Sequence, residues 1–205
     1  MFEIFNENYM RDSVKVRGGR MRVSIPDIAG LSDFFCEYGG SSFNEGLYRI
    51  IRADNLHVWQ DRVDLAFPEF RDRVVCFGFD WAGRIFALDA GRLEDGQAGV
   101  LLLEPGTGEA LRIPSHLQTF HDSELVEFGE AALGVSFYEK WRTLGGVAPA
   151  YNQCIGYRRP LFLGGIDGVE NLEVSDIDIY WHIMGQLILK VKDFPPGAAV
   201  NINIS

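Results

Sequence analysis

The spacing of apolar residues divides the chain into helical and extended stretches. Apolar positions that recur every three to four residues predict helices at 26–38, 54–65, 123–133, 137–144 and 178–189. Short apolar runs bounded by turn residues predict strands at 46–51, 74–80, 84–88, 100–104 and 109–113. Asp54 and Ser123 are the expected N-caps of two helices, because their side chains can accept hydrogen bonds from free backbone N–H groups.

The four strands between residues 74 and 113 are joined by short or polar connections at 81–83, 91–99 and 105–108. In the last of these, Pro105 fixes φ and the glycines permit positive φ, which is strong turn chemistry. Sequential strands with such connections form an antiparallel meander. The sequence therefore predicts the α+β class: a mostly antiparallel, twisted sheet with packed helices and a C-terminal helical portion.

The chain is less regular on either side of the meander. Residues 1–26 are expected to form an N-terminal arm, irregular through residue 22, with Gly18-Gly19 as a flexible point. Residues 147–166 show no sustained periodicity and are expected to be loop. We therefore divide the chain into the arm, an α+β domain at 27–146, and a C-terminal region at 147–205 that shares the domain's core.

Composition excludes several classes of partner. The chain has 205 residues, 47% of them hydrophobic, and a formal net charge of −10, which argues against nucleic acid and against anionic membrane surfaces. No apolar run approaches the roughly 18 residues of a membrane span, and the first residues do not resemble a secretory signal. Cys36, Cys76 and Cys154 are widely spaced and odd in number, so we predict buried free thiols. These features indicate a cytoplasmic protein.

The negative charge is concentrated in two segments. Residues 89–139 contain ten acidic and two basic residues and carry −8, whereas residues 167–178 contain five acidic residues and no basic one and carry −5. Acidic faces keep proteins soluble, and they also speed association with a basic partner. Both interpretations stay open at the level of the sequence.

Motifs for catalysis or cofactor binding are absent from the sequence. It has no P-loop, no dinucleotide-binding fingerprint and no Gly-x-Ser-x-Gly nucleophile elbow. His121 with Asp122 is interpreted as ordinary surface rather than as part of a metal site. We predict no catalytic residue, no cofactor, no metal site and no enzyme activity. Six residues are instead candidates for binding a protein partner: Glu170, Glu173, Asp176, Asp178, Asp80 and Trp81.

These candidates have alternative interpretations. Tyr and Trp next to acids are typical anchors of protein interfaces, and Trp81 follows Asp80 in an expected turn. The position of Trp81 is equally compatible with a side chain that closes the edge of the sheet. For the four acids at 170–178, the alternative is a solvated face without a partner.

Several segments resemble a known family. They are LSDFFCEYGG at 31–40, FNEGLYRI at 43–50, FGFDWAGRIFAL at 77–88, YNQCIGY at 151–157, PLFLGG at 160–165, ENLEV at 170–174 and YWHIMGQL at 180–187. Their order resembles bacterial proteins in which a GAD-like region precedes the C-terminal domain of type VI secretion immunity proteins. The resemblance covers about residues 27–190. It implies a relationship to the SUKH superfamily, whose α+β fold serves immunity proteins and a yeast cell-wall-synthesis regulator.

The resemblance implies a cytoplasmic protein that neutralises a cognate secreted toxin, often a nuclease, by occluding its active site. A nuclease presents a basic cleft to nucleic acid, and an acidic inhibitor can occupy such a cleft. The expected partner is therefore a basic toxin, and neither nucleic acid nor a membrane. Two alternatives stay open: a regulatory or scaffolding module with an endogenous partner, and a metal-assisted hydrolase that uses the acids of 167–178.

Overall fold

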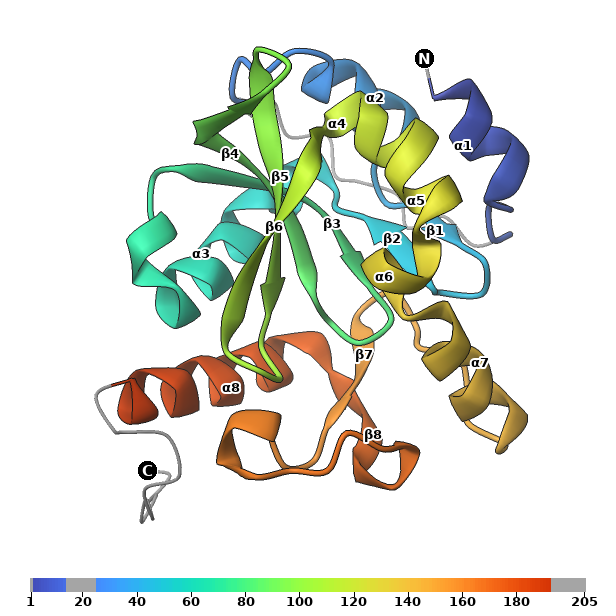
Figure 1. Cartoon of the computed structure of the whole chain (residues 1–205), viewed down its shortest axis with the longest axis vertical. Helices are drawn as coiled ribbons and strands as arrows, with labels where there is room; N and C mark the ends of the chain where they lie inside the picture. The colour runs from blue at the N-terminus through green and yellow to red at the C-terminus, as the bar shows by residue number, and fades with distance from the viewer. Residues whose placement is uncertain (1, 14–24, 193–205) are drawn as a thin grey trace.

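A six-stranded antiparallel sheet occupies the centre of the computed structural model, which describes residues 2–13 and 25–192 (Figure 1). The strands are neighbours in chain order: β1 (Ser42–Phe43), β2 (Tyr48–Ile50), β3 (Val74–Asp80), β4 (Ile85–Glu94), β5 (Gln97–Glu104) and β6 (Glu109–His116). The expected meander is confirmed, and β1 and β2 extend it at the β3 edge. The predicted α+β class is confirmed as well.

Helices pack around this sheet. The α-helices are α1 (Glu3–Asn8), α2 (Leu31–Tyr38), α3 (Leu56–Ala66), α4 (Leu117–Thr119), α5 (Leu125–Glu127), α6 (Gly129–Leu133), α7 (Val135–Thr143) and α8 (Ile177–Val191). A π-helical turn, η3 (Phe120–Glu124), joins α4 to α5. Short 3-10 turns are η1 (Ala53–Asn55), η2 (Pro68–Phe70), η4 (Leu161–Leu163) and η5 (Val169–Asn171).

A β-bulge in β3 turns Phe77 and Phe79 to opposite faces of the sheet. The register between β3 and β4 shifts just before Gly78. Phe77 therefore packs against Phe120 of η3, with 5.7 Å between ring centroids, whereas Phe79 packs against Trp59 of α3 at 4.2 Å. In a regular strand, residues two apart share one face. Because helices cover both faces of the sheet at β3, the side chains on both faces are buried, which explains the almost continuous apolar run.

The longest hairpin of the sheet replaces a predicted loop. β4 continues to Glu94 and β5 begins at Gln97, so the loop expected at 91–99 is wrong. The connection is Asp95-Gly96, with φ values of 50° and 79°. An Asp-Gly pair with two positive φ values is typical of the tight turn that matches strand twist. The end of β4 is mostly exposed, so it lacks the apolar alternation that reveals a strand.

Two predicted helix caps are wrong. Asp54 lies inside η1 and pairs with Arg52 at 2.6 Å, and the residue before α3 is Asn55. Ser123 lies inside η3, because the helical run that contains it already begins at Leu117. The first predicted helix also starts later than expected, at Leu31. Gly30, with φ of 76°, separates it from the irregular residues before it.

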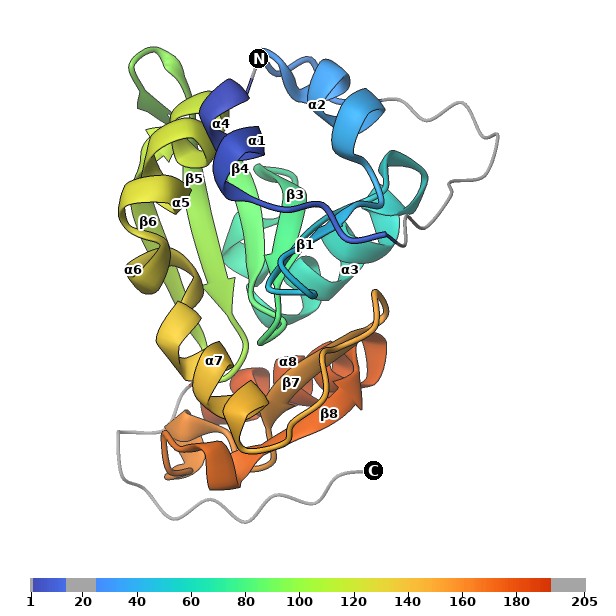
Figure 2. The same ribbon diagram turned by 90° about the vertical axis from the view of Figure 1, so that its right-hand side faces the viewer.

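The first residues form a packed helix where an irregular arm was expected. α1 lies against η3 and α5 (Figure 2). Phe5 and Tyr9 are buried, their rings stack at 4.8 Å, and the Tyr9 hydroxyl donates to the carbonyl of Leu125 at 2.9 Å. A helix of six residues has too few turns to show a periodic pattern in the sequence. Gly18-Gly19 lies outside the described residues.

A second, two-stranded antiparallel sheet lies with α8 at the opposite end of the molecule from α2 (Figure 2). It consists of β7 (Gln153–Tyr157) and β8 (Leu172–Asp176). The loop predicted at 147–166 is therefore wrong for β7. Its only adjacent apolar residues before Gly156 are Cys154 and Ile155, a run too short to stand out from the flanking loops. The helix predicted at 178–189 is confirmed as α8.

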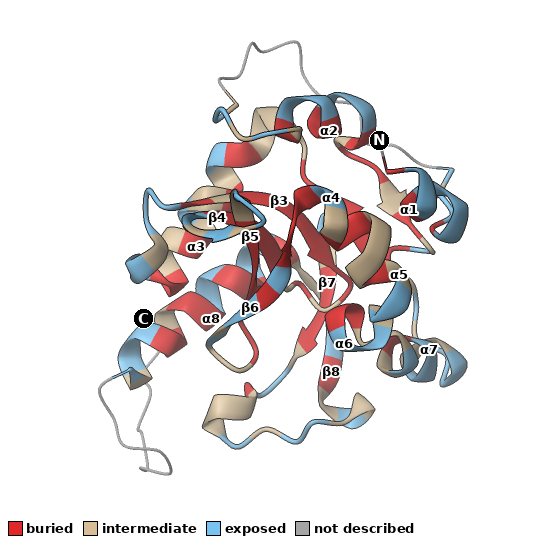
Figure 3. Ribbon diagram, turned by 45° about the horizontal axis from the view of Figure 1, so that its top comes forward, coloured by how far each residue is buried: buried red, intermediate tan, exposed pale blue. Residues whose placement is uncertain are grey.

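Buried residues of both sheets form one hydrophobic core (Figure 3). In α8, the fully buried Trp181 donates its indole N–H to the carbonyl of Gly83, at 2.7 Å, and so ties α8 to the β3–β4 turn.

Cys76 and Cys154 are buried as predicted, whereas Cys36 is exposed on α2. Of the helices that the structure describes, none has the length and hydropathy to cross a membrane.

Candidate partner-binding site

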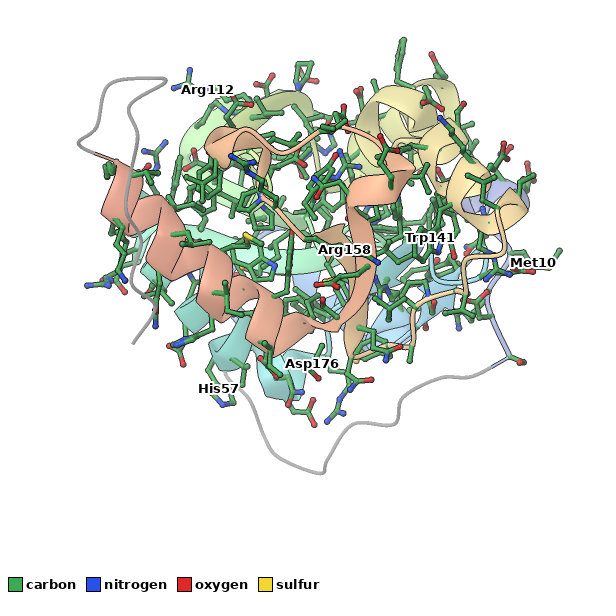
Figure 4. All side chains as sticks on the ribbon, turned by 90° about the horizontal axis from the view of Figure 1, so that it is seen from below. Met10, His57, Arg112, Trp141, Arg158 and Asp176 are labelled. Carbon is green, nitrogen blue, oxygen red and sulfur yellow. The ribbon has the colours of Figure 1, made fainter. Side chains whose placement is uncertain are left out.

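Four of the six predicted binding residues lie around the start of α8, where Figure 4 labels Asp176. Glu170 belongs to η5, Glu173 to β8, and Asp178 to the first turn of α8; all three are exposed. Asp176 lies between β8 and α8 and is half-buried. Glu173, Asp176 and Asp178 follow one another from β8 into α8, whereas Glu170 lies in the turn before β8, at its other end.

The four acids differ in how far the fold already uses them. Asp176 caps α8, because its Oδ1 accepts hydrogen bonds from the backbone N–H groups of Asp178, at 2.9 Å, and Ile179, at 3.3 Å. Asp178 in turn accepts from Arg62 of α3. Both acids therefore hold local structure in addition to facing solvent.

Glu170 and Glu173 are more available to a partner. Glu173 pairs with Arg158, at 3.5 Å, but more than half of each side chain is exposed, and exposed pairs of this kind contribute little to stability. Glu170 has no ion pair within the part of the chain that the structure describes. These two carboxylates are the best candidates for direct contact with a basic group.

Asp80, in contrast, is fully buried in the β3–β4 turn. Its Oδ1 accepts from the backbone N–H groups of Ala82, at 3.0 Å, and Arg84, at 2.9 Å, and its Oδ2 accepts from Arg84 Nε at 2.5 Å. Burial raises the pKa of the Asp80 carboxyl above its ordinary value, and the charge of Arg84 opposes that rise. This carboxylate shapes the turn, so we remove Asp80 from the candidate surface.

Trp81 is also interior, with 2% of its surface exposed. Its indole N–H donates to the carbonyl of Leu133 at 2.7 Å, and its ring packs against Tyr138 at 5.2 Å. Its own carbonyl accepts from the backbone N–H of Ile155 in β7, at 2.8 Å. The structure thus supports the alternative interpretation, in which Trp81 closes a sheet edge, and we remove it from the candidate surface as well.

Arg49 is a buried residue whose role the sequence did not indicate. Its Nη1 donates to the carbonyls of Ala150, at 2.9 Å, and Gln153, at 2.5 Å, and its Nη2 donates to the carbonyl of Asp80 at 2.5 Å. The guanidinium also lies over the ring of Phe79 at 4.4 Å, and burial lowers its pKa to about 10. Arg49 therefore fixes the entry to β7 against the large sheet, although in sequence it looks like one polar residue in an apolar strand.

Much of the first acidic segment is used inside the fold. Asp89 is buried and pairs with Arg73 at 2.6 Å, and burial raises the pKa of the mostly enclosed Glu104. Asp122 accepts from the backbone N–H of Phe5 at 3.1 Å. α5, which carries the exposed Glu127, contacts α1. The two acidic segments nevertheless meet elsewhere, because the charge of Asp167 also raises the pKa of Glu104, and α7, which carries Glu139, contacts η5.

His121 is buried, so its expected place on the surface is wrong. Its Nδ1 lies 2.7 Å from the carbonyl oxygen of Leu117 and its Nε2 lies 3.0 Å from the Tyr48 hydroxyl. Nδ1 must donate to the carbonyl, which leaves Nε2 to accept from the hydroxyl. Over residues 2–13 and 25–192, no group of three or more His, Cys, Asp or Glu side chains is placed to hold a metal ion.

The fold and the candidate site define an α+β protein with an acidic stretch of surface where β8 leads into α8. Residues 115–188 match the family model described as T6SS immunity protein Tdi1, C-terminal. The matched residues run from the end of β6 into α8 and include that acidic stretch. The predicted resemblance to type VI secretion immunity proteins is confirmed. No curated protein matches the chain.

One solved structure extends the fold comparison beyond those residues. The crystal structure of Atu4351 from Agrobacterium tumefaciens superimposes with a TM-score of 0.55 over 91% of this chain and 89% of that one, at 15% sequence identity. At this identity the likeness concerns the fold alone. The likeness covers 91% of this chain, so it extends beyond residues 115–188 to the large sheet. The SUKH and GAD-like relationships stay predictions.

Proposed function

We propose that this protein is an immunity protein that binds and neutralises a cognate secreted toxin. The match of residues 115–188 to the type VI secretion immunity family carries the proposal. The mode of action is stoichiometric binding in the cytoplasm that occludes the toxin's active site, without catalysis by this chain. A nuclease toxin suits this mode best, because its basic cleft would attract the carboxylates of Glu170 and Glu173.

The product of the neighbouring gene is the partner to test first. We expect cells that produce this product alone to stop growing, and cells that also produce the full chain to grow. The purified proteins should form a stoichiometric complex in size-exclusion chromatography and isothermal titration calorimetry. An unrelated secreted toxin serves as the control. The absence of both a complex and protection would overturn the proposal.

The exposed acids at η5 and β8 should govern how fast the toxin is captured. We expect Glu170→Lys/Glu173→Lys to lower the association rate constant about tenfold at low ionic strength, because electrostatic steering raises association rates by factors of ten or more. The dependence of this rate on salt should flatten at the same time. Stopped-flow mixing at several sodium chloride concentrations measures both.

Glu7→Lys/Glu127→Lys is the matched control for this charge reversal. It changes the net charge by the same amount, but at exposed positions on α1 and α5, away from β8. We expect it to alter the association rate much less. If the two double variants slow capture equally, the overall charge of the protein rather than this surface attracts the toxin, and the placement of the site is wrong.

A further inference from the structure

A groove of about 530 Å³ runs along the surface between α3 and α8. In Figure 4, the labelled His57 near the start of α3 and Asp176 at the start of α8 lie at the same end of this helix pair. The helices touch where Gly185 faces Leu65, since a Cβ at Gly185 would lie 3.1 Å from Leu65 Cγ. The groove opens beside this contact, toward the starts of both helices.

The walls of the groove are apolar side chains that the core does not use. Val58 and Leu65 of α3 and Ile179 and Ile183 of α8 line it. Ile179 is 60% exposed and Ile183 is 36% exposed, although both belong to a helix that buries most of its apolar residues. Large apolar side chains grouped on the surface around a groove are typical of interaction sites.

Arg62 lies at the charged side of this groove with one donor group unused. Its side chain is only 10% exposed and is held by two neighbours: Nε donates to Asp178 Oδ1 at 2.9 Å, and the guanidinium lies 4.0 Å from the centre of the Trp59 ring. Its Nη1 is buried and has no acceptor among the described residues. A buried donor without an acceptor is costly, so an oxygen of a bound segment gains a hydrogen bond there if the Arg62 side chain turns toward the groove.

The rim of the groove is negative. Asp61 is exposed and has no ion-pair partner in the described part of the chain, and Asp178 is 65% exposed and shared with Arg62. A segment that enters the groove therefore meets apolar walls, a carboxylate at the rim and one unfilled donor. An apolar centre surrounded by a charged rim is the usual arrangement of a protein interface.

We propose that this groove binds a segment of the toxin that carries a large apolar side chain next to a lysine or arginine. The apolar side chain lies between Ile179 and Ile183, the cation pairs with Asp61, and a carbonyl oxygen of the segment accepts from Arg62 Nη1. The proposal rests on the proposed function and extends its acidic surface along α8. Charge complementarity favours a basic segment over a second copy of this acidic chain.

The test uses the full chain and the toxin that the wild-type protein binds. We expect Ile179→Glu to weaken the complex at least thirtyfold in isothermal titration calorimetry, and Asp61→Lys to weaken it about tenfold. Leu93→Glu is the matched control, because Leu93 is 63% exposed on the β4–β5 hairpin, outside the groove. This variant should bind the toxin with the affinity of the wild type. Equal urea unfolding midpoints verify that each variant is folded.

The outcomes separate this proposal from the proposed function. If the wild type does not bind the toxin, the proposed function fails. If the wild type binds and both groove variants bind equally well, the groove proposal alone fails. The groove proposal is also wrong if Ile179→Glu converts a dimer to a monomer in sedimentation without changing toxin affinity, because the groove would then hold a second copy. It is wrong as well if Ile179→Glu no longer lowers toxin affinity in a chain that ends at Lys192, because the groove would then hold residues 193–205.

Discussion

Replacement of Asp80 by asparagine is expected to destabilise the folded protein by about 3–5 kcal/mol, the usual cost of removing one partner from a buried ion pair. Asp80 is fully buried and Arg84 is 13% exposed, so Arg84 would keep its charge in the interior without a carboxylate. Arg84 Nη2 also donates to the carbonyl of Ala132 at 3.1 Å, which hinders the side chain from turning out to water. Urea unfolding followed by tryptophan fluorescence measures the loss.

Asp95→Asn is the matched control for this substitution. Asp95 is exposed in the β4–β5 turn with φ of 50°, a conformation that asparagine adopts readily, so the same chemical change should cost less than about 0.5 kcal/mol. The pair of variants also tests the role of Asp80 directly. If Asp80→Asn keeps the stability of the wild type but loses affinity for the toxin, Asp80 is a binding residue and its structural role is wrong.

Acid should destabilise the protein partly through His121. Burial lowers the pKa of His121 to about 3, whereas an unfolded histidine has a pKa near 6.5. Between these values the unfolded chain binds a proton that the folded chain does not, so the free energy of unfolding falls as the pH drops through this range. By pH 3, this one group has removed on the order of 4 kcal/mol.

The slope of stability against pH identifies this contribution. One proton of difference corresponds to about 1.4 kcal/mol per pH unit, so between pH 6 and pH 4 the unfolding free energy of His121→Gln should decline less steeply than that of the wild type by up to this amount. His57→Gln, at an exposed histidine, should keep the wild-type slope. Urea titrations at each pH supply the slopes, and identical slopes for all three proteins would show that His121 is not the group that titrates.

The strands of the meander could be predicted because their signals are local. Apolar runs such as 74–80 are bounded by residues that favour turns, and β3 begins and ends where the run does. The end of β4 and the whole of β7 could not be predicted in this way. The end of β4 is exposed, and β7 has only Cys154 and Ile155 as adjacent apolar residues before Gly156, so neither shows a pattern that distinguishes a strand from a loop.

The candidate site could be predicted only in part. The acids at 170, 173 and 178 are exposed as expected, because charged side chains in a base-free run seldom find partners inside a core. Asp80 and Trp81 have equally suggestive neighbours in sequence, yet distant residues enclose both. Arg49, from β2, donates to the carbonyl of Asp80, and the partners of Trp81, Leu133 and Ile155, lie more than fifty positions further along the chain. Burial at such a turn is set by distant segments, which local chemistry does not reveal.

The connection between β7 and β8 lies at the end of the small sheet away from its main anchors. Arg49 and Trp81 hold β7 near Gln153, and Gln153 pairs with Asp176, the cap of α8. The intervening residues 158–171 are tied mainly to one another, as when Asn171 donates to the carbonyls of Arg159 and Ile166. Phe162 and Leu163 still pack against the core, so substitutions at the exposed positions of this stretch should leave the fold unchanged. Under the proposed function, related proteins could therefore differ in sequence here, and in the toxin they bind, while keeping the same scaffold.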